Sequence, residues 1–592
     1  MTTLGWKRVS VVVLICATTA IASPAQTFKV LTNFNGPDDG ETPVGSVIQA
    51  TDGNFYGTTA QGGAHYYGSV FRITPAGKMT TLYGFGAEPN CTDGAQPVAA
   101  LVQGTDGNFY GTTYFGGAKS TICGGDLYFG YGTIFKITAT GNLTTLYSFC
   151  SLSNCADGEY PSAELLQAID GNFYGTTEWG GANGAGTIFK ITAGGVLTTV
   201  YSFCSKANCA DGAYPFSGLI QSADGTFYGT TEGGGVSVSY CSSSGGFACG
   251  TVFEITPSGK LTTLYTFCSV KNCPDGSSPL AGLIQDANGN FYGTTSAGGY
   301  LGSQDSICSD SGGCGTLFEI GSDRKFHTLH AFCMQHGCPD GMWPIAGLVQ
   351  ATDGKLYGTA SAGGSSSTCE VGCGTIFRIT SDGAFTVLYS LTNTDGADPR
   401  AGLLQATSGT FYGTTSGDEG IYGSGTVFSM SVGLGPLVTF VRGTADVGKT
   451  VEILGQGFVG STGVSFNGTA ATFKVKSDTY IAAIVPVGAT TGPVTVATPS
   501  GTLTSNVPFR VRPQILSFNP TSGAVGTQVT ITGVSLTQTI GVSFGGVPAT
   551  SFTVNSDTQV TATVPAGALS GHIGITTAGG RTWSTAAFTV TQ

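Results

Sequence analysis

Several things are scarce in this chain of 592 residues. Charged residues make up only 10% of it, and there are five histidines, five methionines and four tryptophans. No long stretch repeats apolar residues at helical spacing, which excludes a mainly helical fold. The net charge of −12 offers no basic face, so nucleic-acid binding is disfavoured. After the first 25 residues no apolar run is long enough to cross a membrane as a helix.

Glycine and aromatic residues are abundant instead. The chain has 95 glycines, and aromatics account for 10% of it. Short strands joined by tight turns have this composition. The length exceeds what one hydrophobic core usually serves, so we expect several domains.

The N-terminus carries an export signal. Lys7 and Arg8 precede an apolar run from Val9 to Ala22, and small residues follow up to Ala25. This order predicts a secretory signal peptide over residues 1–25 and an extracellular or cell-surface location. Cys16 lies inside the apolar run behind Ile15, where a lipoprotein signal would have a small residue, so lipidation is the less favoured interpretation.

One series of short sequence motifs, called words below, recurs seven times. Its core is "FYGTT", followed by a word like "GTIFKIT", a word like "LTTLYSF", the motif "DGxxP" and an apolar word like "AGLIQ". The copies are 54 to 65 residues apart. Repetition at this period indicates a repeat architecture. The tyrosines of the seven copies are Tyr56, Tyr110, Tyr174, Tyr228, Tyr292, Tyr357 and Tyr412.

Each unit predicts four antiparallel strands. "FYGTT", "GTIFKIT" and "LTTLYSF" are rich in aromatic and β-branched residues, and Asp-Gly before "FYGTT" favours a tight hairpin. Four strands repeated seven times predict a seven-bladed β-propeller over residues 26–432, with a solenoid as the alternative. The repeat region begins with "FKVLTNF" at Phe28, which matches the fourth-strand pattern alone. It ends with "GTVFSM" at Gly425, which matches the third-strand pattern, so the last unit has no fourth strand of its own. We therefore expect the N-terminal strand to complete the last blade.

Cysteines occur in close pairs within the loops of one face of this propeller, which we call the top face. Without Cys16 there are sixteen, an even number. Local C-x4-C pairs lack the usual spacing of a zinc site, and exported thiols oxidise, so disulfides are favoured over zinc. Cys91 and Cys123 remain after the local pairs are assigned, and we expect them to bond to each other. The predicted disulfides are Cys91–Cys123, Cys150–Cys155, Cys204–Cys209, Cys241–Cys249, Cys268–Cys273, Cys308–Cys314, Cys333–Cys338 and Cys369–Cys373.

The repeat words resemble the GloVer tandem repeat of bacterial exported proteins described as choice-of-anchor proteins. The resemblance covers about residues 28 to 430 and implies export and surface display, without an established biochemical activity. The words are also loosely similar to NHL-type propellers.

The last 160 or so residues contain a different duplication. "VGKTVEILGQGF" at Val447 returns as "VGTQVTITGVSL" at Val525. The alternating strands and turns predict two immunoglobulin-like β-sandwich domains, over residues 433–511 and 512–592. "ILSFNPTSGAVGTQVTITG" from Ile515 strongly resembles the IPT/TIG domain, which implies a spacer or interaction module. The whole chain is thus expected to be all-β.

No catalytic set can be assembled from these words. The histidines, His65, His327, His330, His336 and His572, occupy no recurring position. Glu178 and Glu232 follow "GTT" in neighbouring units and could support acid–base chemistry on a polysaccharide, but adjacent blades need not bring them close. The first-strand words are apolar, so the central channel looks poor in metal ligands. We expect no enzymatic activity, no metal and no cofactor.

The recurring aspartates of "DGxxP" allow two interpretations. They could bind calcium through oxygens on the top face, or cap a turn before glycine, which we favour. They are Asp39, Asp93, Asp157, Asp211, Asp275, Asp340 and Asp395.

Aromatic residues of the top-face loops are the best ligand-binding candidates. Flat rings can stack on the apolar faces of sugars, although they could also simply pack over the ring of blades. The candidates are Tyr114, Phe115, Tyr160, Trp179, Tyr214 and Trp343.

We therefore expect a secreted or cell-surface binding or adhesion scaffold whose partner is an extracellular polysaccharide or a surface protein. An extracellular lyase or hydrolase acting on polysaccharide is the alternative, and a structural surface-layer component is a second one.

Overall fold

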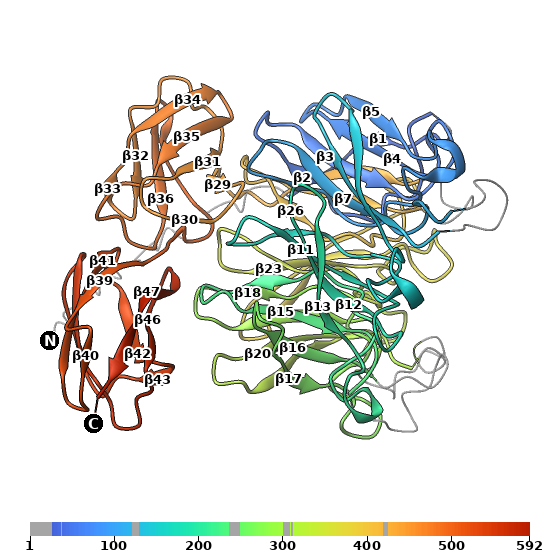
Figure 1. Cartoon of the computed structure of the whole chain (residues 1–592). Helices are drawn as coiled ribbons and strands as arrows, with labels where there is room; N and C mark the ends of the chain where they lie inside the picture. The colour runs from blue at the N-terminus through green and yellow to red at the C-terminus, as the bar shows by residue number, and fades with distance from the viewer. Residues whose placement is uncertain are drawn as a thin grey trace, which may run out of the picture.

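The computed structural model describes residues 26–36, 38–120, 130–235, 249–299, 308, 312–417 and 424–591 (Figure 1). Seven four-stranded antiparallel sheets form a ring, and two β-sandwiches follow it. The predicted all-β class, with a seven-bladed propeller followed by two immunoglobulin-like domains, is confirmed.

The innermost strand of each blade is only two residues long. These strands are β2 (Ile48–Gln49), β6 (Val102–Gln103), β10 (Leu166–Gln167), β14 (Ile220–Gln221), β18 (Ile284–Gln285), β22 (Val349–Gln350) and β26 (Leu404–Gln405). The apolar word predicted a longer strand. Instead, the residues between the DGxxP proline and these two-residue strands form no β-sheet pairing. Proline has no N–H to donate, and the chain bends there towards the next blade.

The second strands are buried along almost their whole length. They are β3 (Phe55–Thr59), β7 (Phe109–Thr113), β11 (Phe173–Thr177), β15 (Phe227–Thr231), β19 (Phe291–Thr295), β23 (Leu356–Ala360) and β27 (Phe411–Thr415). The third strands are β4 (Ser69–Ile73), β8 (Thr133–Ile137), β12 (Thr187–Ile191), β16 (Thr251–Ile255), β20 (Thr316–Ile320), β24 (Thr375–Ile379) and β28 (Thr426–Ser431).

The outermost strands are half-buried. They are β5 (Met79–Gly84), β9 (Leu143–Ser148), β13 (Leu197–Ser202), β17 (Leu261–Thr266), β21 (Phe326–Ala331), β25 (Phe385–Ser390) and β1 (Thr27–Asn33). Three short 3-10 helices follow outermost strands in the top loops: η1 (Pro89–Cys91), η2 (Ser153–Cys155) and η3 (Ala207–Cys209).

The ring is closed by the N-terminal strand. β1 pairs antiparallel with β28, from Thr27 opposite Ser431 to Asn33 opposite Thr426, so the last sheet has the order β1-β28-β27-β26. The Phe28 ring stacks on Tyr389 of the preceding blade at 4.2 Å between centroids. This confirms the expected latch and excludes the solenoid, in which the first and last units would not meet.

Neighbouring blades are joined by a repeated aromatic contact. In six units the tyrosine of this word packs on the phenylalanine of the next copy, as in Tyr56–Phe109 and Tyr110–Phe173, both at 4.1 Å. Tyr292 instead shares a hydrophobic cluster with Leu356, which replaces the phenylalanine of the next copy. Tyr412 and Phe55 make the aromatic contact between the last blade and the first, at 4.0 Å. Such pairs contribute about 0.5–1.5 kcal/mol each beyond the area they bury.

A hydrogen bond accompanies each aromatic contact. The first threonine of the word donates from Oγ1 to a backbone carbonyl of the next blade, for example Thr176 to Ser217 at 3.0 Å. Thr414 donates to Gly45 across the closure. All seven blades make this bond, through Thr58, Thr112, Thr176, Thr230, Thr294, Thr359 and Thr414. The ring is therefore uniform in its interblade bonding.

The first sandwich packs two sheets over one apolar core. Its sheets contain β29 (Thr439–Phe440), β31 (Thr450–Leu454), β35 (Tyr480–Ile484) and β34 (Phe473–Ser477), and β33 (Thr469–Ala470), β32 (Gly463–Phe466), β36 (Val494–Thr498) and β37 (Gly501–Thr504). A parallel pair, β30 (Thr444–Ala445) and β38 (Arg510–Val511), joins its ends.

The second sandwich has the same plan with one more strand paired into a sheet. Its sheets contain β39 (Gln514–Asn519), β41 (Gln528–Val534), β45 (Gln559–Thr563) and β44 (Phe552–Ser556), and β40 (Ser522–Gly523), β47 (Gly580–Val590), β46 (Gly571–Thr577), β42 (Thr539–Phe544) and β43 (Val547–Pro548).

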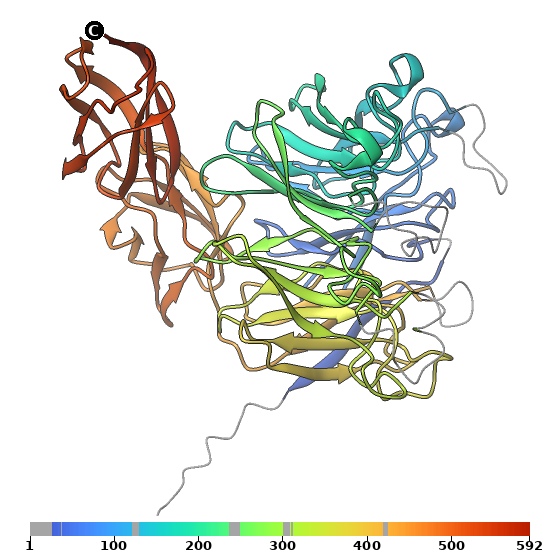
Figure 2. The ribbon, with the colours of Figure 1, turned by 90° about the horizontal axis from the view of Figure 1, so that it is seen from below.

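The first sandwich lies against the bottom face of the propeller, where the Asp-Gly turns are, and Figure 2 shows both sandwiches on that side. Arg442 donates to the carbonyls of Ala168 and Ile169, and Arg510 donates to that of Gln221 at 3.1 Å. Thr479 Oγ1 donates to the Thr51 carbonyl at 3.0 Å. The top face is therefore the end of the ring that the sandwiches leave uncovered.

The latch leads to a stability prediction. Phe28→Ala removes the half-buried ring that packs on Tyr389 and Phe428, and we expect it to lower the free energy of unfolding by about 2–3 kcal/mol. Lys29→Ala, on the exposed side of the same strand, should cost less than about 0.5 kcal/mol. Denaturant unfolding of both variants measures this. Equal losses in the two would mean that β1 does not close the ring through its apolar side.

Candidate functional site

Two residues of every blade surround the top mouth of the central channel. One precedes the DGxxP proline and the other follows the second strand, and a backbone hydrogen bond joins them, as from Glu232 N to Tyr214 O at 3.0 Å. We call these fourteen positions the rim. They are Thr42 and Ala60, Gln96 and Tyr114, Tyr160 and Glu178, Tyr214 and Glu232, Ser278 and Ser296, Trp343 and Ser361, and Asp398 and Ser416.

The pre-proline rim residue has a left-handed backbone in every blade. Tyr160 and Tyr214 have φ of 57° and Trp343 has φ of 56°, values that bulky L-residues rarely adopt. A helical conformation before proline is disfavoured as well. The residue is held by a second backbone bond, from its own N–H to the loop before the third strand, as from Tyr214 N to Ala185 O at 2.9 Å. The aromatic side chains are thus set in fixed directions at the mouth.

Five of the six aromatic candidates form one cluster on blades two to four, which we call the rim cluster. Tyr114 stacks on Tyr160 at 5.2 Å between centroids, and Phe115 meets Tyr160 edge-on at 5.6 Å. Trp179 packs against Tyr214 at 4.4 Å. Trp179 is 37% exposed, whereas the other four rings are half-buried. The indole of Trp179 is thus exposed to solvent and packs on one ring of the cluster, that of Tyr214.

Glu178 ties the cluster together across a blade boundary. Its carboxylate accepts a hydrogen bond from the Tyr114 hydroxyl at 2.7 Å and another from Trp179 Nε1 at 3.0 Å. Burial and this carboxylate raise the pKa of Tyr114, which therefore stays a donor at neutral pH. The sequence shows the two residues 64 positions apart and gives no sign of this contact.

Glu232 belongs to the same neighbourhood, although the sequence did not require it. Burial raises the pKa of Glu232, and the charge of Glu178 raises it further. The pKa of Tyr214 is also raised, by burial first and then by Glu178 and Glu232. The two carboxylates therefore act on each other and on the same ring. Sequence reasoning also missed Tyr131, whose ring lies 5.9 Å from that of Tyr160.

Trp343 lies outside the rim cluster. It lines a hollow of about 540 Å³ with Leu280, Ile345 and the ion pair of Asp398 and Arg400. None of the described aromatic residues contacts its ring. The six candidates are therefore divided between two places on the top face.

The DGxxP aspartates are turn caps. Asp211 accepts bonds from the Tyr201 hydroxyl at 2.7 Å and from the Ser205 backbone N–H at 2.9 Å. Tyr147 and Asp157 repeat the tyrosine contact, and in blade five His330 takes the tyrosine's place, 2.9 Å from Asp340. In these aspartates the oxygens are directed at the donors of the turn, which favours the turn-cap interpretation. Asp275 differs, because its Oδ2 accepts from Tyr265 and from the Cys268 N–H while its Oδ1 is buried with no hydrogen-bond partner among the described residues.

Six of the expected cysteine pairs are disulfide-bonded: Cys150–Cys155, Cys204–Cys209, Cys268–Cys273, Cys308–Cys314, Cys333–Cys338 and Cys369–Cys373. Cys91 and Cys249 are also disulfide-bonded. Their expected partners, Cys123 and Cys241, lie outside the described residues, as do residues 1–25.

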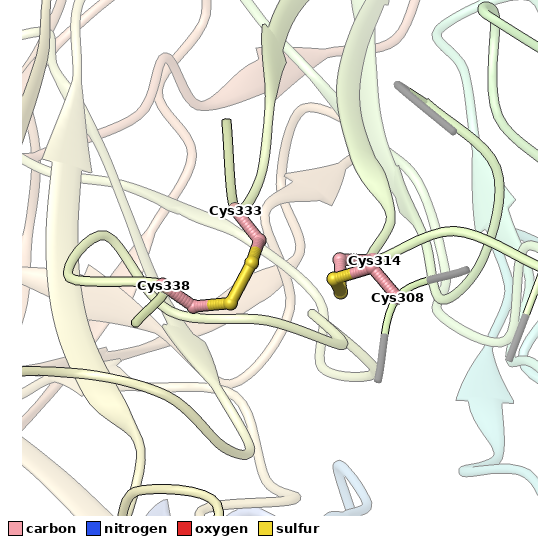
Figure 3. A group of neighbouring side chains, drawn as sticks. All are labelled: Cys308, Cys314, Cys333 and Cys338. Atoms are coloured by element: carbon pink, nitrogen blue, oxygen red, sulfur yellow. A yellow bond between two sulfur atoms is a disulfide. The ribbon is translucent and has the colours of Figure 1, made fainter. Parts of the chain in front are cut away.

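Two of the disulfides lie side by side in blade five (Figure 3). The sulfurs of Cys308, Cys314, Cys333 and Cys338 are within 4.8 Å of one another and buried. That spacing would suit a metal held by four thiolates, but sulfurs joined in disulfides are not thiolates. These four cysteines are part of a hydrophobic cluster with Phe332 and Met342.

The sequence can now be placed among known proteins. A model of the Gloeobacter/Verrucomicrobia repeat family matches residues 18–154, 121–306 and 306–452. The chain belongs to the Gloeobacter/Verrucomicrobia repeat family. Two copies of the IPT/TIG domain match residues 437–511 and 513–591 of this repeat protein. No curated protein matches it.

Solved structures resemble the repeat protein only distantly. A surface glycan-binding protein from Prevotella bryantii is 20% identical over 26% of this chain and 39% of its own length, with a TM-score of 0.20. A protein of unknown function from Bacteroides thetaiotaomicron is 14% identical over 69% of this chain and 76% of its own, at 0.35. A copper-containing fungal alcohol oxidase is 12% identical over 95% and 100%, at 0.41. Likeness at this level carries no argument about function.

The disulfides suit an oxidising environment such as the cell surface or its exterior. Among the helices of the described residues, none has the length and apolar character needed to span a membrane.

The aspartate caps predict an alkaline limit to stability. Burial and the carboxylates of Asp157 and Asp211 raise the pKa of Tyr147 and Tyr201 to about 12, against an ordinary value of 10. Folding therefore favours neutral tyrosine. This stabilisation should be complete below about pH 10 and be lost as the pH rises towards 12.

Unfolding free energies between pH 8 and 12, measured beside tyrosinate absorbance, test this. Tyr201→Phe should be less stable at pH 7, because Asp211 loses a donor, but should lose less stability on the alkaline side. An unchanged alkaline slope in that variant would contradict the assignment.

Proposed function

We propose that this repeat protein is an exported surface protein that binds polysaccharide at the rim cluster. The observation that carries the proposal is the exposed Trp179 indole, packed on Tyr214 and held at its Nε1 by Glu178. An indole fixed in this way can stack on the apolar face of a sugar ring without losing further freedom on binding.

The polar groups beside the indole suit the same ligand. Sugars present hydroxyl donors around apolar faces, and ionised carboxylates accept hydrogen bonds from such donors. Glu178 lies directly beside the indole, and Glu232 is close enough for the two charges to interact. Rigid rings with adjacent acceptors are what orient a ligand in a mostly apolar site.

The scaffold supports the site through rigidity. The pre-proline backbone is pinned by two hydrogen bonds in each blade, and the Cys204–Cys209 disulfide closes the loop that leads to Tyr214. The predicted signal peptide would deliver the chain to the outside of the cell, where polysaccharide is available. The first candidate function of this site is binding without cleavage.

The proposal is tested by binding of the mature chain to a polysaccharide and glycan array, followed by affinity measurement on the best polymer. Trp179→Ala should weaken binding at least tenfold, because the stacking platform is lost. Trp583→Ala, which removes the exposed tryptophan of the second sandwich, is the matched control and should leave the affinity unchanged. Equal affinities in both variants and the parent would overturn the rim cluster as the site.

Cleavage of the bound polymer is a second candidate, favoured by the interaction of Glu178 with Glu232. Burial and the charge of Glu178 raise the pKa of Glu232, and a carboxyl of raised pKa beside a second carboxyl group is an arrangement that glycosidases use. Reducing-end release from the bound polymer, abolished by Glu232→Gln, would establish it. Binding with no release over long incubation would leave the protein as a binder.

A further inference from the structure

The central channel contains a ring of residues below the rim. The third residue after each DGxxP proline occupies an equivalent position, and we call these seven residues the constriction ring. They are Ser46, Ala100, Glu164, Gly218, Gly282, Gly347 and Gly402. Neighbours are close around the ring. A Cβ on Gly218 would lie 2.8 Å from Cγ of Glu164, and one on Gly402 would lie 3.2 Å from the carbonyl oxygen of Gly347.

The backbone carbonyls of this ring have no hydrogen-bond donors within the part of the chain that the structure describes. The carbonyl one residue earlier accepts the interblade bond from threonine, for example at Ala163 and Ser217. The carbonyls of the constriction ring itself accept no hydrogen bond from any described residue. Three of them, on Gly218, Gly282 and Gly347, lie 3.2 to 3.8 Å from the Cβ position of the next glycine in the ring. These Cβ positions are equivalent to that of Glu164, whose side chain lines the hollow below the ring, so we infer that the three oxygens border the same lumen.

Glu164 is the one charged residue of the ring. More than a third of it is accessible, yet blades surround it on every side, so it contacts water within the channel. Its carboxylate has no hydrogen-bond or ion-pair partner among the described residues. An enclosed carboxylate without a counter-charge is costly unless a cation or water compensates it.

A hollow of about 380 Å³ lies directly below the ring. Glu164, Gln49, Gln103 and Gln405 line it, and the first sandwich contributes Asn506. Asn506 Oδ1 is buried and has no hydrogen-bond donor among the described residues. The volume is large enough for an ion with several waters.

We propose that the constriction ring binds one hard metal cation, with Ca²⁺ as the first candidate. Its ligands would be the Glu164 carboxylate, carbonyl oxygens of the glycines that follow it around the ring, and water from the hollow. Carboxylate, carbonyl and water oxygens are the ligand set that such cations prefer. The site is separate from the rim cluster and from the capped aspartates.

Isothermal titration of the full mature chain with CaCl₂ tests the proposal, with MgCl₂, NaCl and KCl titrated in parallel. One carboxylate predicts weak binding, with one ion per chain and a Kd of about 10⁻⁴–10⁻³ M. Glu164→Gln should weaken binding at least tenfold. Glu88→Gln, which neutralises an exposed carboxylate in a top loop, should bind as the parent does.

A second variant keeps the proposal falsifiable if Glu164→Gln folds poorly. Gly347 has an ordinary backbone, and a Cβ there would meet nothing closer than 3.8 Å. Gly347→Leu should therefore fold, fill the lumen and abolish binding while Glu164 stays intact. Absence of binding of all four cations by the parent at 10 mM, used as roughly ten times the weakest expected Kd, would overturn the proposal. Unchanged binding in Glu164→Gln would overturn it as well.

Discussion

The whole molecule depends on the contact between one blade and the next. In six units the tyrosine of "FYGTT" packs on the following phenylalanine, and the adjacent threonine donates to a carbonyl of the same neighbour. Each sheet is too small to bury its two faces alone, so a blade is stable only when it packs between two neighbouring blades. The contact between Tyr412 and Phe55 and the pairing of β1 with β28 complete the circle, which leaves no blade with an unpaired face.

Closure of the ring also allows side chains near its axis to vary while the fold stays the same. Equivalent positions of seven units meet around one axis, at the rim and again at the constriction ring. The backbone bonds that build these rings involve N–H and C=O groups, so the side chains are free to differ. Tyr160, Tyr214 and Trp343 occupy the same position as Ser278 and Asp398, with the same left-handed backbone. The sector on blades two to four is aromatic and acidic, whereas the other rim positions are small or polar except for Trp343.

The repeated strand pattern could be predicted from the sequence, whereas contacts made by the side chains of a single unit could not. Seven copies of a strand pattern predict the blades, and the order of words at the two ends predicts the latch. The bond between Tyr114 and Glu178 could not be predicted, because it joins different blades and depends on side-chain directions set by the loops. The apolar first-strand words suggested a channel poor in ligands. The carbonyl oxygens of the constriction ring, which accept no hydrogen bond from the described residues, could not be predicted. Backbone oxygens are present in every residue and therefore leave no pattern in a sequence.

The position of the first sandwich makes the two faces of the propeller different. Arg442 and Arg510 donate hydrogen bonds to carbonyl oxygens of the bottom turns. Asp170 and Asp224 of the same turns add an electrostatic attraction to these contacts. The first sandwich also covers the bottom of the channel with a folded module and leaves the rim as the accessible end. A ligand that reaches the channel from the rim would first meet the aromatic rings and carboxylates of the rim cluster and then the oxygens of the constriction ring. The two proposed sites therefore lie in series along one axis.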